Sequence, residues 1–199
     1  MNNNIQKQLG QTDIYIIDQI LKGRYKAGDH MLDAGCGIGR NLHWFLQQGF
    51  HISGIDLNND VIQELKKQYS HLPAANFSVS SIADTPFADQ QFDHIICSAV
   101  LHFADNKTQF YSMLNELLRI LKKGGSLFIR IASDIGIEDK VELIGDGVYK
   151  IPDGSTRFLL TRSLLAEFLN QKNLSLLEPV KTTNVDDIRC MTTLLLKKL

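Results

Sequence analysis

Three alternating glycines are the residues of this sequence whose type and spacing most clearly suggest ligand chemistry. Gly35, Gly37 and Gly39 follow a short apolar segment that ends at Asp33, and a helical pattern comes next. Because glycine has no Cβ, the chain can turn sharply here and a ligand can approach the backbone closely. The N–H groups at the start of the next helix add hydrogen-bond donors. The pattern predicts a ligand-binding turn between a strand and a helix.

The spacing of these glycines separates two classes of ligand. A dinucleotide-binding turn has the pattern G-x-G-x-x-G. This chain instead has G-x-G-x-G followed by Arg40, and the phosphate-binding pattern G-x-x-x-x-G-K-[ST] is absent. Asp33, just before the turn, would repel a pyrophosphate but could hold a cationic amine. The spacing therefore disfavours a nicotinamide-dependent oxidoreductase.

A second carboxylate stands at the expected end of the next strand. Asp56 comes 21 residues after Gly35. An acidic residue at this place can accept hydrogen bonds from the hydroxyls of a ribose. Together with Asp33, it fits one ligand that carries an amino group, a ribose and no phosphates.

These residues need a sheet to position them, and the sequence predicts one. Short apolar segments alternate with longer helical patterns, which is typical of βαβ units. We expect an α/β fold with a doubly wound, seven-stranded, mostly parallel sheet, an antiparallel last strand and helices on both faces. The strands are expected to end at Asp33 and Asp56 and to span about 76–79, 92–97, 126–131, 174–181 and 189–196.

The connections between these strands are expected to be helices, one hairpin and one short turn. Helices are expected near 12–22, after the glycines, from Asn58, from Asp105 or Asn106 to Lys123, and from about Thr161. Lys122 and Lys123 should occupy a last helical turn that Gly124 terminates, since positive charge is favourable there. Residues 148–160 should form a hairpin around Pro152-Asp153-Gly154. The polar segment 182–187 should join the last two strands.

The composition is that of an ordinary globular chain. The 199 residues are 44% hydrophobic, with 21 basic and 22 acidic residues and a net charge of -1. This balance gives no footprint for nucleic acid or for an anionic membrane, so neither is expected as a partner. Three scattered cysteines, without C-x-x-C or H-E-x-x-H, predict neither a disulfide framework nor a metal site. A polar beginning without a signal peptide or an apolar span leads us to expect a cytoplasmic protein.

Segment 31–41 resembles motif one of the class I S-adenosylmethionine-dependent methyltransferases. The resemblance covers about 29–131 and continues, in the family's order, through Gly54–Leu57, Asp84–Phe87, Phe92–His102 and Leu118–Gly125. The step Gly39-Arg40-Asn41 also resembles the tellurite-resistance type. The resemblance implies a Rossmann-like fold, S-adenosylmethionine as cofactor with S-adenosylhomocysteine as product, and a small-molecule methyl acceptor.

The resemblance also implies a role for each matching residue. The glycine turn would pass the methionine and ribose of the cofactor with Gly35, Cys36, Gly37, Gly39, Arg40 and Asn41. Asp33 would lie near the amino acid end, and Asp56 would bind the ribose hydroxyls. Around adenine and beside the methionine, the matching residues are Leu57, Ser81, Ile82, Cys97 and Ser98. Many relatives have an acidic residue where Ser81 stands.

The acceptor side is less defined by the sequence. His102 follows the fourth strand and is either a general base or a pocket wall. Arg130, at the end of the fifth strand, either contacts substrate or forms a surface ion pair. Tyr149 and Arg157 lie on the expected hairpin, which is either a lid or a solvated element.

A single domain, 1–199, is expected, with a cofactor half at about 29–91 and acceptor-side elements at about 92–199. The leading hypothesis is methyl transfer to an unidentified small molecule by in-line displacement. The alternative is a non-catalytic S-adenosylmethionine-binding module or sensor on the same fold. The sequence leaves the oligomeric state open.

Overall fold

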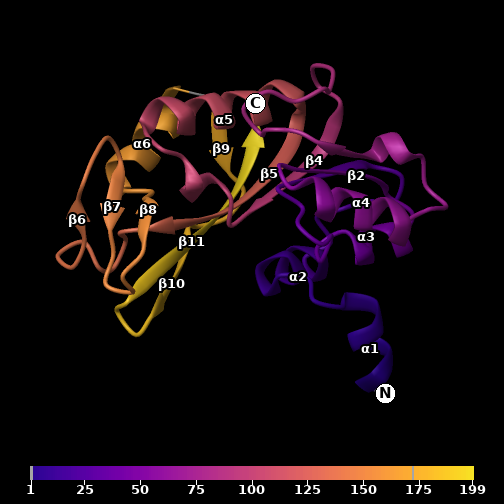
Figure 1. Cartoon of the computed structure of the whole chain (residues 1–199), viewed down its shortest axis with the longest axis horizontal. Coiled ribbons are helices and arrows are strands. Elements are labelled where there is room, and N and C mark those ends of the chain that lie inside the picture. The colour runs from indigo at the N-terminus through magenta and orange to yellow at the C-terminus, as the bar shows by residue number, and fades with distance from the viewer. Residues whose placement is uncertain (1, 172) are drawn as a thin grey trace.

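A mixed β-sheet runs through the centre of the computed structural model, which describes residues 2–171 and 173–199 (Figure 1). The strand order is β10-β11-β5-β4-β1-β2-β3, and β9 also pairs with β11. The strands are β1 (His30–Ala34), β2 (His51–Asp56), β3 (Phe77–Val79), β4 (Phe92–Ser98), β5 (Leu121–Ser133), β9 (Leu174–Leu176), β10 (Lys181–Val185) and β11 (Arg189–Lys198). β1 to β5 pair in parallel, whereas β11 is antiparallel to β5. The predicted Rossmann-like sheet with an antiparallel closing strand is confirmed.

Helices cover both faces of this sheet. These are α2 (Ile14–Leu21), α3 (His43–Gln47), α4 (Asn59–Gln68), α5 (Lys107–Ile120) and α6 (Arg162–Gln171), with short 3₁₀ turns η1 (Ala74–Asn76) and η2 (Leu101–Phe103). Helix α1 (Asn2–Leu9) contacts α3 and projects away from the sheet (Figure 1). The expected N-caps form: Asn58 accepts from the N–H of Asp60, and Asn106 from that of Gln109. Each cap satisfies backbone donors that have no partner within the helix.

The apolar core is divided by the sheet into two layers. Neighbouring strand residues point to opposite faces, so Leu32 and Ile95 join α5 and α6 in one cluster, while Met31 and Ile96 join α2, α3 and α4 in the other. This explains why the central strands are apolar on both sides rather than alternating.

Two predicted boundaries are wrong at the end of α5. The helix stops at Ile120, and Lys122 and Lys123 lie in β5 rather than in a last helical turn. Lys122 Nζ lies 2.8 and 2.9 Å from the two carboxylate oxygens of Asp93, at the start of β4. The lysine charge is therefore neutralised across the sheet and not by the end of the helix.

The polar segment that was expected to be a turn is an edge strand. Residues 181–185 form β10, and the expected strand 174–181 shortens to β9. β10 tolerates polar side chains because it lies at the sheet edge, where Thr182 Oγ1 is 2.8 Å from Thr192 Oγ1 of β11. The turn itself is left to Asp186 and Asp187, both with positive φ.

The predicted hairpin is present and belongs to a second, smaller sheet beside the first (Figure 1). β7 (Val148–Lys150) pairs with β8 (Thr156–Phe158), and β6 (Glu142–Leu143) adds a strand that was not predicted. Phe158 stacks on Phe110 of α5 with ring centroids 4.8 Å apart. This contact ties the hairpin to the main core. Among the described residues, no helix combines the length and apolar character needed to cross a membrane.

Two leucines allow the burial of the core to be tested with matched substitutions. Leu117 of α5 is fully buried, whereas Leu143 of β6 is 61% exposed. Leu117→Ala should lower the free energy of unfolding by about 2–5 kcal/mol, because it leaves a cavity. Leu143→Ala should change it by no more than about 0.5 kcal/mol. Urea denaturation measures both, and equal effects would contradict this assignment of the core.

Candidate functional site

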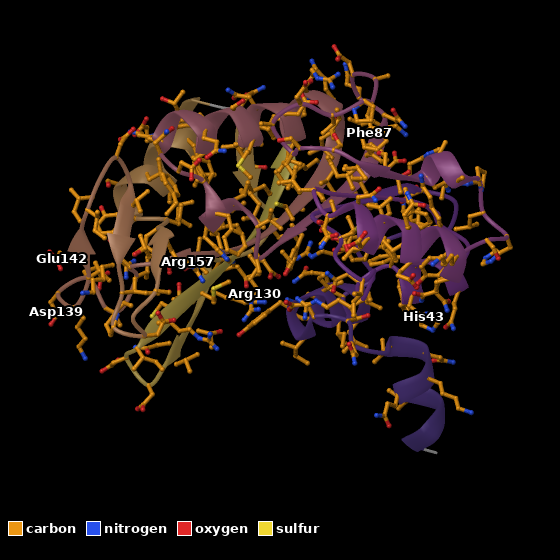
Figure 2. The ribbon with its side chains drawn as sticks, viewed as in Figure 1. His43, Phe87, Arg130, Asp139, Glu142 and Arg157 are labelled. Atoms are coloured by element: carbon orange, nitrogen blue, oxygen red, sulfur yellow. The ribbon has the colours of Figure 1, made fainter. Side chains whose placement is uncertain are left out.

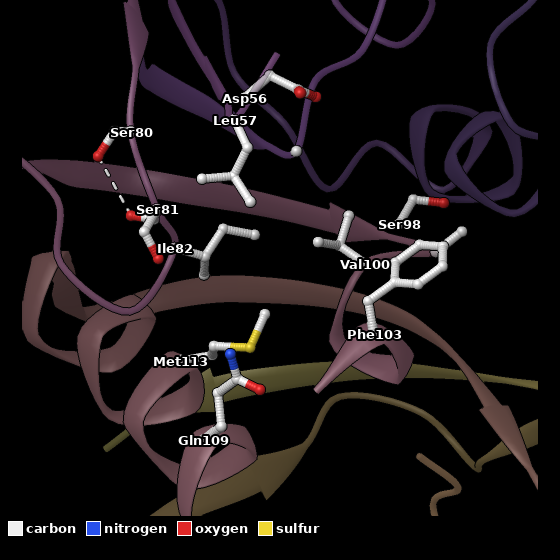
Figure 3. Close-up of a pocket in the computed structure, with 12 residues that line it drawn as sticks. Asp56, Leu57, Ser80, Ser81, Ile82, Ser98, Val100, Phe103, Gln109 and Met113 are labelled. Carbon is white, nitrogen blue, oxygen red and sulfur yellow. Dashed lines mark hydrogen bonds between the residues drawn. The ribbon is translucent and has the colours of Figure 1, made fainter. Parts of the chain in front are cut away.

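A cavity of about 360 Å³ lies at the carboxyl ends of the parallel strands (Figure 3). Its walls come from the ends of β1 and β2, the loop after β3, the segment after β4, and α5. The lining residues are Gly35, Asp56, Leu57, Ser80, Ser81, Ile82, Ser98, Ala99, Val100, Phe103, Gln109 and Met113. Open α/β sheets bind ligands at this edge, in the crevice where the connections from two neighbouring strands lead to opposite faces of the sheet.

The glycine loop is bound to the end of β2 by hydrogen bonds. The N–H groups of Gly35 and Cys36 both donate to the carbonyl of Ile55, at 2.8 and 2.9 Å. The N–H of Gly37 donates to Asp56 Oδ2 at 2.9 Å. The loop and the Asp56 carboxylate are therefore fixed relative to one another by the chain itself.

The Asp56 carboxylate retains acceptor capacity beyond these contacts. Its other oxygen, Oδ1, accepts from the N–H of Asn58 at 2.9 Å. A carboxylate has about four lone-pair sites, so further acceptor positions remain for hydroxyl donors. Leu57, the next residue, is 75% exposed at the cavity wall. A carboxylate beside an exposed apolar side chain suits a ligand with a hydroxylated part and a flat apolar part.

The carboxylate of Asp33 is buried and unpaired. The residue is 1% exposed, and neither of its oxygens has a partner at hydrogen-bond geometry, although the Asn41 side chain is close enough to lower its pKa. Burial raises its pKa to about 7, against the opposing influence of the Arg40 charge. An unpaired buried carboxylate is costly unless it is protonated or meets a cation. Asp33 is therefore poised to stabilise a cationic group at the end of β1.

Asp13 contacts residues from four separate segments near the site, and it was not among the residues predicted from the sequence. It caps α2 by accepting from the N–H of Tyr15. Its Oδ2 lies 3.3 Å from both Ser98 Oγ and Arg130 Nη1, and 3.6 Å from Arg40 Nη2. The Asp before an apolar helix could have predicted the cap. No local signal could have predicted its distant arginines.

A second cavity, of about 290 Å³, adjoins the first. It is lined by Ala99, His102, Arg130, Ala132, Ile151, Asp153, Ser155, Arg157, Arg189, Cys190 and Met191. Ala99 borders both cavities. The three arginines come from β5, β8 and β11, which are far apart in the sequence.

His102 is buried at this second cavity and is neutral at pH 7. Burial and the charges of Arg157 and Arg130 lower its pKa to about 4. The N–H of Ala132 lies 3.4 Å from Nδ1, which therefore acts as acceptor. We assign the remaining proton to Nε2 on this basis. In this state the ring offers a donor rather than a free lone pair.

The structure brings together only part of the predicted site. Six predicted cofactor residues line the first cavity: Gly35, Asp56, Leu57, Ser81, Ile82 and Ser98. The other predicted cofactor residues are not among the lining residues: Asp33, Cys36, Gly37, Gly39, Arg40, Asn41 and Cys97. Of the acceptor-side candidates, His102, Arg130 and Arg157 line the second cavity.

The remaining candidate and the cysteines have packing contacts. Tyr149 packs against the cluster of Ala132, Ile151 and Leu159. All three cysteines are buried and free of disulfides. Burial raises the pKa of the Cys36 and Cys97 thiols, so neither is a ready nucleophile. Within residues 2–171 and 173–199, no three His, Cys, Asp or Glu side chains gather as metal ligands.

The close packing of the glycine loop predicts unequal effects of two alanine substitutions. A Cβ at Gly35 would lie 2.4 Å from Val100 Cγ2, whereas one at Gly37 would meet nothing within 4 Å. Both glycines have positive φ, so both changes add backbone strain. Gly35→Ala should lower the free energy of unfolding by at least about 1 kcal/mol more than Gly37→Ala.

The same denaturation experiment with Gly35→Ala/Val100→Ala provides the control. Removing the Val100 methyl groups should recover part of the loss, so the two changes should be non-additive. Additive effects, or a larger cost at Gly37, would show that this contact does not shape the loop.

Comparison with known proteins adds the family to this geometry. Residues 32–129 match the methyltransferase domain family. A ubiquinone biosynthesis O-methyltransferase of Rickettsia bellii is 32% identical over 133 residues, which are 66% of this chain and 52% of that protein. The chain spans 21–52% of the length of the first curated relatives it matches.

Two solved structures share the fold at low sequence identity. A Methanosarcina mazei S-adenosylmethionine-dependent methyltransferase is 19% identical with a TM-score of 0.72, covering 90% of this chain and 97% of that one. A Burkholderia thailandensis 1,6-didemethyltoxoflavin-N1-methyltransferase, with bound 1,6-didemethyltoxoflavin and S-adenosylhomocysteine, is 19% identical with a TM-score of 0.66, covering 92% and 75%. Sequence motifs, sheet order and family match agree: residues 32–129 form a domain of the methyltransferase domain family, and the fold of the chain is that of S-adenosylmethionine-dependent methyltransferases.

Proposed function

We propose that this protein transfers a methyl group from S-adenosylmethionine to a small-molecule acceptor. The observation that carries this proposal is the pairing of two carboxylates around one glycine loop, at the sheet edge where the first cavity opens. Asp33 is buried and unpaired, and Asp56 is hydrogen-bonded to the loop with acceptor capacity to spare. One carboxylate suits a cationic amine, and the other suits ribose hydroxyls.

The residues of the first cavity fit the cofactor in three parts. Asp56 would accept from the ribose hydroxyls, in the role known for acidic residues at this strand end. Leu57, Ile82 and Met113 would enclose adenine with apolar surface, since all three line the cavity (Figure 3). Asp33 would balance the ammonium group of the methionine part. S-adenosylmethionine has no pyrophosphate, which agrees with the two carboxylates beside the glycine loop.

Catalysis in this proposal depends mainly on alignment. S-adenosylmethionine supplies a methyl group on a sulfonium leaving group, so an acceptor lone pair can displace it in line. Holding the two reactants in register can contribute about 7–11 kcal/mol to the barrier reduction. The lone pair of His102 Nδ1 already accepts from the N–H of Ala132. His102 would therefore donate a hydrogen bond to the methyl acceptor and orient it, rather than remove a proton from it. This favours an acceptor atom that arrives with an available lone pair.

The acceptor is proposed to be a small molecule. The second cavity, at about 290 Å³, has the volume of a small-ligand site. The Burkholderia relative holds 1,6-didemethyltoxoflavin together with S-adenosylhomocysteine, which supports the same arrangement here. Formation of S-adenosylhomocysteine above background, when candidate acceptors are added, would separate a transferase from a non-catalytic binding module.

Removing the charge of Asp56 should weaken cofactor binding. Asp56→Asn should raise the dissociation constant of S-adenosylhomocysteine about 10- to 100-fold, because hydrogen bonds to charged groups are worth about 1.5–3 kcal/mol. Isothermal titration calorimetry measures the change. Asp60→Asn is the matched control, because Asp60 is exposed in the first turn of α4 and does not line the cavity. Equal affinities for wild type and Asp56→Asn would contradict the ribose assignment.

The raised pKa of Asp33 predicts that cofactor binding depends on pH. Below about pH 7 the buried carboxyl is mostly protonated, and a bound ammonium group favours its charged form. Binding should therefore release a proton. The affinity for S-adenosylhomocysteine should rise by up to about tenfold per pH unit below the pKa and level off above about pH 7.

Calorimetry from about pH 5.5 to 7.5, where the ligand amine stays cationic, measures this dependence. Asp33→Asn has no proton to release at this position, so its profile should be nearly flat. A wild-type profile without slope, or an equal slope in Asp33→Asn, would argue against the ammonium assignment.

A further inference from the structure

The second cavity carries more positive charge than its surroundings neutralise. Arg130, Arg157 and Arg189 line it, whereas Asp153 is the single carboxylate among the lining residues. His102 is neutral, because its pKa lies at about 4. Of the described residues, no carboxylate lies within 4.0 Å of Arg157 or Arg189 to form an ion pair. Unpaired guanidinium groups in a concave site are suited to an anion.

Arg130 is held in place by contacts with its neighbours. Its side chain is 24% exposed, its Nη1 lies 3.3 Å from Asp13 Oδ2, and its guanidinium lies 5.3 Å from the ring centroid of Tyr15. These contacts fix the side chain. Its Nε is nevertheless buried without a hydrogen-bond partner. The guanidinium of Arg130 is therefore fixed in position beside the cavity, and one of its N–H donors has no partner.

Arg157 lines the same cavity from β8. One of its nitrogens donates to the carbonyl of Thr156 at 2.8 Å. Its guanidinium lies 5.2 Å from the ring centroid of Phe103, a 60% exposed residue that lines the first cavity. Arg130 and Arg157 are both labelled in Figure 2. The first and second cavities are therefore connected in two ways. Ala99 lines both of them, and Arg157 of the second cavity contacts Phe103 of the first.

We propose that the methyl acceptor is a small organic carboxylate whose anionic group lies among Arg130, Arg157 and Arg189. This inference rests on the proposed function, because it identifies the second cavity as the acceptor side of the same site. The flat, forked guanidinium matches the geometry of a carboxylate. An acceptor anchored there extends past Ala99 towards the first cavity. Asp153 leaves the lining residues with a modest positive excess, which suits a singly charged group.

Matched probes can test this inference without knowledge of the natural acceptor. Benzoate and benzamide have nearly the same shape but differ in charge, and inorganic phosphate represents the other common oxyanion. Each is titrated into the protein saturated with S-adenosylhomocysteine. Benzoate should bind at least about tenfold more tightly than benzamide and more tightly than phosphate.

Substitutions then locate the binding. Arg157→Gln and Arg189→Gln should each weaken benzoate binding at least about fivefold, while S-adenosylhomocysteine binding stays unchanged. Arg162→Gln is the control, since Arg162 lies on α6 and is 71% exposed. Thermal denaturation of each variant checks that the fold is retained.

Several outcomes would overturn the inference. Equal binding of benzoate and benzamide, tighter binding of phosphate, or an equal loss in Arg162→Gln would each do so. If S-adenosylhomocysteine binds but no benzoate binding is measured, only the acceptor assignment fails. If S-adenosylhomocysteine itself does not bind, the proposed function fails and this inference fails with it.

Discussion

The hydrogen bonds that tie the glycine loop to the end of β2 are the constraint on which the site depends. Parallel pairing of β1 with β2 places Ala34 beside Ile55. The chain then turns so that Gly35 and Cys36 donate to Ile55, and Gly37 donates to Asp56. One cluster of short contacts therefore sets the loop, the carboxylate and the mouth of the cavity together. Neither Asp56 nor the loop can shift without breaking these bonds.

The site is divided electrostatically along the sheet edge. The side of the glycine loop is acidic, with Asp33 and Asp56 on β1 and β2, whereas the second cavity is lined with arginines from β5, β8 and β11. Asp13 stands between them and contacts Arg40 and Arg130. A sulfonium cofactor and an anionic acceptor would each face charge of the opposite sign. In the proposed reaction, the methyl donor and the methyl acceptor would therefore be recognised by groups of opposite charge.

The strand ends and the glycine turn at the first cavity could be predicted because their signals are local. A strand, its glycines and the next acidic strand end are each readable within a few residues. Gly35 and Asp56 were expected to share one ligand, and they line one cavity. The second cavity could be predicted only in part. His102, Arg130 and Arg157 were candidates and do line it, but Arg189 was not a candidate, because only the antiparallel pairing of β11 with β5 brings it to this cavity. Edge strand β10 was missed for a related reason: its polar residues become a strand only because β11 supplies a partner.

A crystal structure with bound S-adenosylhomocysteine tests the central claim most directly. The account predicts ligand density in the first cavity, with both ribose hydroxyls within hydrogen-bond distance of the Asp56 carboxylate and the amino group on the side of Asp33. Density at another place, or a ribose turned away from Asp56, would contradict it.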